Sequence, residues 1–102
     1  MIMNRERLSA ILHEILESDN VYYQPPESSK IKYPAIVYSR EKIDNAFAND
    51  SVYKQDIAYT ITVIDKNPDS EIVKKISRLP MCKFDRHFTS GNLNHDVFIL
   101  YF

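Results

Sequence analysis

The sequence predicts an α+β fold in which two helices flank a mostly antiparallel sheet of about four to five strands, in the order α-β-β-β-α-β-β. Two stretches have apolar residues at helical spacing, and most of the remainder alternates or runs apolar over lengths typical of strands. The 102 residues suit one domain, and 44% hydrophobic with 26% charged residues is typical of a globular protein. We therefore expect a single α+β domain over residues 1–102.

Apolar stripes predict the two helices. In the first, the apolar residues recur at helical spacing: Leu8, Ile11, Leu12, Ile15 and Leu16. Asn4 is expected to cap this helix, and the turn-forming residues 18–20 end it. The second helix is expected to start at Asn67-Pro68 and to stop at Pro80. Its stripe is formed by Ile72, Val73, Ile76 and Leu79.

Three strands are predicted before the second helix. Residues 21–23 form a short strand, and residues 33–38 form another with Pro34 at its start or on a sheet edge. The longest strand spans residues 53–64. Its odd-numbered apolar residues face one side, and its small and hydroxyl residues face the other: Ile57, Tyr59, Ile61 and Val63, against Ala58, Thr60 and Thr62. One face is therefore expected to be packed, and the other to be wet or part of an interface.

Two further segments affect the expected surfaces. Residues 40–51 are polar and rich in turn-forming types, so they predict a long loop, either functional or a plain solvated hairpin loop. Two last strands are expected over 82–89 and 95–102, joined by a turn in which Gly91, the only glycine, takes a positive φ. Residues 97–102 are apolar on both faces, so this strand is expected to be central or half-covered by another subunit.

Composition excludes several classes of function. The net charge of −1 and the scattered cations do not match a nucleic-acid-binding or anionic-membrane surface. The single cysteine, Cys82, cannot form an internal disulfide and is expected to be a buried thiol in a reducing compartment. A single glycine excludes the glycine-rich loops that bind phosphates. No signal peptide or membrane-spanning segment is expected.

One cluster, residues 85–87 with residues 94–96, contains possible metal ligands. Alternation puts Asp85 and His87 on one face, with His95 and Asp96 across the turn. Such a set suits a divalent metal, but an ordinary His–Asp hydrogen bond or an intersubunit salt bridge explains it equally well. Alternation also places Cys82 and His87 on opposite faces, which argues against a Cys–His catalytic pair.

Three strings carry a resemblance to a known family: YPAIVYSREKIDNAFANDSVYK, YTITVIDKNPDSEIVKKISRLPMCKFDRHF and NLNHDVFILYF. Over about residues 8–102, the chain resembles tail-completion proteins of long-tailed bacteriophages and prophages, which are tail-terminator or head–tail joining proteins. The resemblance implies a ring, commonly six-fold, that caps the tail tube and docks to the head connector. It implies a location in the virion, and in the host cytoplasm during assembly, with no cofactor, metal or catalytic residue.

The subunit contacts that we expect combine the segment 40–51 with exposed apolar residues of the sheet: Ile43, Phe47, Tyr53, Tyr59, Tyr101 and Phe102. The main alternative is a small intracellular protein-binding module, such as an adaptor or antitoxin-like regulator, that acts through a sheet edge. A third hypothesis is a metal-dependent hydrolase that uses four residues: Asp85, His87, His95 and Asp96.

Overall fold

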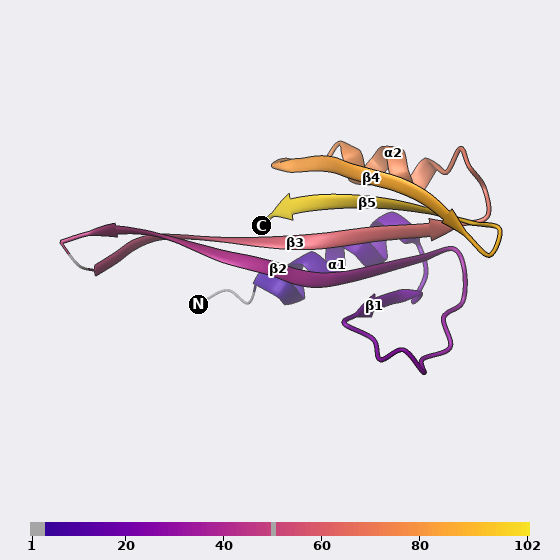
Figure 1. Ribbon diagram of the computed structural model, residues 1–102, viewed down its shortest axis with the longest axis horizontal. Helices are drawn as coiled ribbons and strands as arrows, with labels where there is room; N and C mark the ends of the chain where they lie inside the picture. The colour runs from indigo at the N-terminus through magenta and orange to yellow at the C-terminus, as the bar shows by residue number, and fades with distance from the viewer. Residues whose placement is uncertain (1–3, 50) are drawn as a thin grey trace.

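The predicted order of elements is confirmed in the computed structural model (Figure 1). The structure describes residues 4–49 and 51–102, without the side chains of residues 4 and 52–54. The elements are α1 (Asn4–Leu16), β1 (Val21–Tyr23), β2 (Ala35–Ala48), β3 (Ser51–Asp65), α2 (Glu71–Ser77), β4 (Cys82–Ser90) and β5 (Leu93–Tyr101). The fold class is therefore α+β.

The strands of the described chain form one sheet in the order β1-β2-β3-β5-β4. β1 runs parallel to β2, and all other neighbours are antiparallel. β5 lies between β3 and β4, so the apolar C-terminal strand is central, one of the two arrangements expected from its sequence. Short β1 and longer β4 are the two edges of the sheet.

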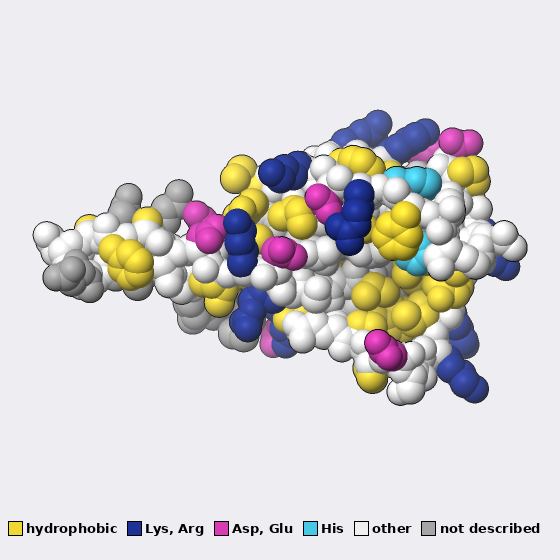
Figure 2. Space-filling model, in the orientation of Figure 1, with side chains coloured by type: hydrophobic (Ala, Val, Ile, Leu, Met, Phe, Trp, Pro, Cys, Tyr) yellow, Lys and Arg dark blue, Asp and Glu magenta, His cyan; other side chains and the backbone are white. Residues whose placement is uncertain are grey.

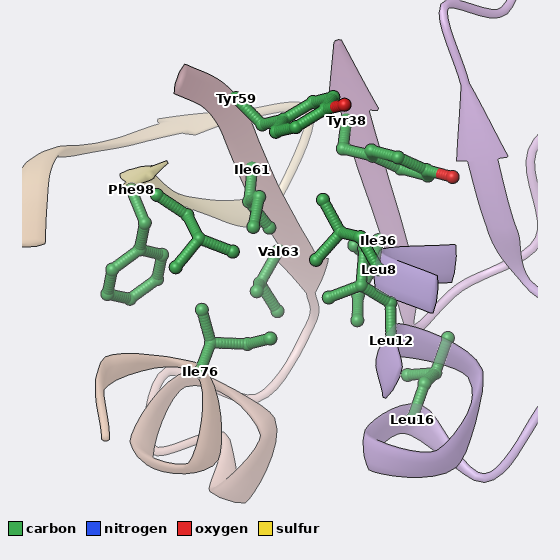
Figure 3. Packing of buried hydrophobic residues seen from close by; sticks show 11 residues of the cluster. Leu8, Leu12, Leu16, Ile36, Tyr38, Tyr59, Ile61, Val63, Ile76 and Phe98 are labelled. Atoms are coloured by element: carbon green, nitrogen blue, oxygen red, sulfur yellow. The ribbon is translucent and has the colours of Figure 1, made fainter. Parts of the chain in front are cut away.

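Both helices cover the same face of the sheet, which we call the covered face (Figure 3). Leu8 and Leu12 of α1 and Ile76 of α2 are fully buried against the sheet. The strands contribute alternate residues to the same cluster: Ile36, Tyr38, Tyr59, Ile61, Val63, Phe98 and Leu100. The packed face predicted for the longest strand is therefore confirmed, and its other residues lie on the opposite, open face.

The ends of the two helices follow local hydrogen bonding. α1 stops at Leu16, and the Asn20 amide donates to the Ser18 hydroxyl (3.0 Å) in the predicted turn. The predicted start of α2 at residues 67–68 is wrong, because the helix begins at Glu71. The Asn67 side chain accepts from the amide of residue 69 (2.9 Å), which forms a turn instead of a helix start. Ser70 is the N-cap and accepts from the Ile72 amide (3.2 Å).

Residues 40–48 form strand rather than the predicted loop. β2 continues to Ala48, and Asn49 turns with a φ of 52°. The neighbouring strands stop earlier, since β1 pairs with β2 only as far as Tyr38 and β5 pairs with β3 only from Ala58 onward. Beyond these points β2 and β3 pair only with each other (Figure 1, left). We call residues 43–57 the arm. It accounts for a long axis of 51 Å, against 24 and 22 Å for the others.

The turn between β4 and β5 agrees with the sequence prediction. Gly91 has a φ of 57° and Asn92 a φ of 64°. Two central residues with positive φ are typical of the tight turns that match the twist of antiparallel strands. The turn ends the sheet on the side opposite to the arm (Figure 1).

Candidate interaction surface

Exposed apolar side chains gather on the arm and along β4. Six large ones among the described residues are at least 41% exposed: Tyr33, Ile43, Phe47, Met81, Phe84 and Phe88. Single exposed apolar residues are common on soluble proteins, whereas groups of them indicate contact surfaces. The exposed residues therefore define three surfaces: the arm, the region around Met81, and the β4 edge with the open face.

The arm holds two apolar side chains away from the body of the protein. Ile43 and Phe47 are four residues apart on β2, an even spacing that puts them on one side of the strand. Phe47 is 65% exposed. The Gln55 side-chain amide donates a hydrogen bond to Asn45 Oδ1 across the two strands (3.0 Å). Lys42 forms an ion pair with Asp44 within β2 (3.4 Å). Most of the apolar surface of Phe47 is therefore open to a partner.

An apolar groove lies at the root of the arm, on the covered side. It has a volume of about 270 Å³ and is lined by residues from α1, from the α2–β4 connection and from the C-terminal strand: Leu8, Ile11, Leu79, Pro80, Met81, Leu100, Tyr101 and Phe102. Met81 forms part of the rim and is 72% exposed. The Phe102 amide donates to the Ile57 carbonyl (3.0 Å), which fixes the groove beside the point where the arm leaves the sheet.

The open face carries mixed charges above apolar strand residues (Figure 2). A hollow of about 350 Å³ is lined by Glu41, Lys42, Thr60, Lys83, Asp85, Arg86, Ile99 and Tyr101. Its charges are partly paired within the chain, since Arg86 contacts Asp85 (2.6 Å) and Glu41 accepts from the Thr60 hydroxyl (2.6 Å). A hydrogen bond to Tyr101, followed by the Asp44 carboxylate, raises the pKa of Lys42. The hollow therefore holds three cations and two carboxylates, and two of the cations, Lys42 and Arg86, are paired with carboxylates of the chain.

The β4 edge has no neighbouring strand on its outer side within the described chain. Phe84 packs edge-on against Phe98 (centroids 5.6 Å apart), and Phe88 stacks on His95 (4.6 Å). A bulge at Asp85 interrupts the register, and Lys83 adds a charge. Bulges and lysines are features that natural edge strands use against uncontrolled pairing.

The residues predicted to contact other subunits lie in different places. Ile43 and Phe47 are exposed on the arm, whereas the Tyr53 side chain lies outside the described residues. Tyr59 is 4% exposed and belongs to the core, so it offers no surface in the single chain. Tyr101 and Phe102 are half-buried and line the groove.

Sequence reasoning missed the exposed residues of the β4 segment. Phe84 and Phe88 are separated by three polar residues, a pattern that predicts only an ordinary strand. Met81 directly follows Pro80, has a φ of 61° and is exposed.

The bulge at Asp85 also separates the four residues considered as a metal site. Asp85 lines the hollow on the open face, and His87 pairs with Asp96 on the covered side. His95 lies opposite Phe88 on the open face. The predicted shared face of Asp85 and His87 is therefore wrong, because an extra residue in a strand reverses the alternation. In the described part of the chain, no three metal-ligand side chains come together.

The same bulge corrects the predicted facing of Cys82 and His87. Cys82 pairs with Leu100 and His87 with Asp96, two even-numbered positions of β5 that share the covered side. The two residues are still five positions apart on one strand, about 16 Å, so they do not form a catalytic pair. Cys82 is half-buried, and burial raises the pKa of its thiol.

Asp96 provides a test of this side of the sheet. Burial raises the pKa of its carboxyl above 3.8, and His87 and His95 partly oppose that shift. A raised pKa in the folded state means that stability falls as the pH rises through that pKa. Asp96→Asn is therefore expected to be more stable than the wild type at pH 7, and the difference is expected to vanish below pH 3.8. Thermal melting across this pH range measures it, and a destabilised variant at pH 7 would contradict the assignment.

Comparisons with protein-family models, with curated proteins and with solved structures found no match to this chain. No helix in the described residues is long and apolar enough to span a membrane.

Proposed function

We propose that the chain is a structural subunit that assembles into a ring, and that this ring terminates the tail tube of a long-tailed phage or prophage and joins it to the head connector. The observation that carries the proposal is the arm, a two-stranded projection with an exposed phenylalanine. The resemblance of residues 8–102 to tail-completion proteins supplies the particular role.

A two-stranded hairpin has little stability of its own in water, so long uncovered hairpins are favoured where they bind something. Exposed Phe47 leaves apolar surface in water that burial against a partner would remove. A ring requires one surface of each subunit to fit a different surface of the next. The arm and the groove at its root are two such surfaces.

The β4 edge favours a second candidate, a module that binds an extended peptide by adding it to the sheet. No strand of the described chain pairs with the outer side of β4, and Phe84 and Phe88 are exposed on opposite faces of this strand. The bulge at Asp85 limits the length over which a peptide could pair without interruption. We therefore rank this function second.

Native mass spectrometry with negative-stain imaging, over a range of protein concentrations, tests the proposal. A closed ring of one stoichiometry is expected, commonly six subunits for this class. Since such a ring can require the tail tube as a template, the same measurement is made with tail-tube protein added. A strict monomer under both conditions would contradict the proposal and favour the peptide-binding module.

A further inference from the structure

We propose that the arm of one copy enters the apolar groove of a second copy, with Phe47 as its anchor. This inference rests on the proposed self-assembly and names the contact that performs it. The groove has the size and chemistry for an apolar anchor, cations lie near it in the sequence, and an arm does not reach the groove of its own chain.

The groove suits an apolar side chain. Its lining residues are apolar apart from Tyr101, whose side chain also borders the hollow on the open face and forms a hydrogen bond with Lys42 there. Its volume of about 270 Å³ lies below the ~300–1,000 Å³ that is common for small-molecule sites. Aromatic side chains bury roughly 150–250 Å² each and act as anchors in protein interfaces. Phe47, the most exposed aromatic residue among those described, has the matching chemistry.

The charges beside the two surfaces are complementary. Arg7 and Arg78 are exposed and adjoin two lining residues, Leu8 and Leu79, in the sequence. Neither arginine forms an ion pair with another described residue. The arm carries the opposite sign, since residues 43–57 hold three aspartates and one lysine. An acidic arm and a basic rim attract each other and favour one orientation.

An arm cannot fill the groove of its own chain. The groove is fixed at Ile57 by the Phe102 hydrogen bond, and Ile57 pairs with Ile43 where the arm begins. Phe47 lies four residues farther out, about 13 Å along an extended strand. The β2–β3 pairing is regular from Lys42 to Ala46, with one register shift before Lys42 and another after Ala46, and the arm extends away from the body of the protein (Figure 1). The occupant of the groove is therefore the arm of another copy.

Cysteine crosslinking tests the contact directly. Asn45→Cys, which keeps Phe47 and lies on the same side of β2, and Met81→Cys are introduced together into a Cys82→Ala background, and the protein is oxidised mildly after assembly. Covalent species that extend beyond a dimer are expected, because each copy then links to two neighbours. A Thr89→Cys, Met81→Cys protein is the matched control, since residue 89 lies at the opposite end of the sheet. Crosslinking no greater than in this control, or a covalent dimer as the only product, would overturn the arrangement.

Removing the anchor distinguishes this inference from the proposed function. Phe47→Ala is expected to weaken self-association about thirtyfold, as for a central aromatic anchor, and to leave the melting temperature of the subunit unchanged. Phe88→Ala, which removes an exposed ring elsewhere, is expected to assemble like the wild type. If Phe47→Ala forms rings at wild-type concentrations, the arm–groove contact is wrong and ring assembly stands. If the wild type forms no ring with or without tail-tube protein, the proposed function fails.

Discussion

Replacement of Phe98 by alanine is expected to lower the free energy of unfolding by about 3–5 kcal/mol. Phe98 is 1% exposed and lies at the centre of β5, between β3 and β4. Its ring packs in the cluster formed by the sheet and both helices (Figure 3). The substitution leaves a cavity that this close-packed neighbourhood cannot fully close. In a domain of this size, such a loss is a large part of the total stability.

Urea denaturation measures this effect, with Phe84→Ala as the matched control. Phe84 pairs with Phe98 across β4 and β5 and touches its ring, but it is 55% exposed. Its removal is expected to cost about 1 kcal/mol, the range of one aromatic contact. A loss for Phe98→Ala as small as that of the control would mean that β5 is not the centre of the core.

The parts of the fold that depend on burial could be predicted from the sequence. Leu8 and Leu12 in α1 lie at helical spacing, and Ile76 belongs to a similar apolar stripe in α2. Both stripes exist because one side of each helix packs on the sheet. Ile61 and Val63 alternate with threonines because β3 has one covered face and one open face. The start of α2 could not be predicted in the same way. Asn67 and Ser70 are both good caps, and the hydrogen bonds of the preceding turn decide between them.

The arm was not predicted as strand, because alternation of apolar and polar residues indicates that a strand has one buried face, and not that the chain is extended. Residues 40–48 lie in a strand with no cover on either face, so polar residues are accepted on both sides and the segment resembles a loop. The candidate metal cluster failed for a different reason. The bulge at Asp85 changes the facing of His87, and no local residue type marks a bulge in advance. The groove could not be predicted from the sequence either, because it is formed by three segments that are distant in sequence.

Shortening the arm is expected to abolish ring assembly while the domain still folds. In this variant residues 44–56 are replaced by Asn-Gly, so that Ile43 and Ile57, which already pair, are joined by a tight two-residue turn. The fully buried core residues lie outside the deleted segment, so the melting temperature is expected to remain close to that of the wild type. Self-association is expected to fall by about a hundredfold or more, since the loss includes both an aromatic anchor and its surrounding contacts. Analytical ultracentrifugation and thermal melting measure the two quantities.

A full-length control separates the chemistry of the arm from its presence. Ile43→Thr with Phe47→Ser keeps the strands, the turn and the acidic residues, and it removes only the exposed apolar groups. Threonine and serine are compatible with an exposed hairpin, so this protein should fold with its arm intact. If this protein, like the shortened variant, does not assemble, apolar insertion provides the contact. If it assembles while the shortened variant does not, backbone pairing or charge on the arm carries assembly instead. Rings formed by the shortened variant would exclude the arm from the interface and direct attention to the open edge of β4.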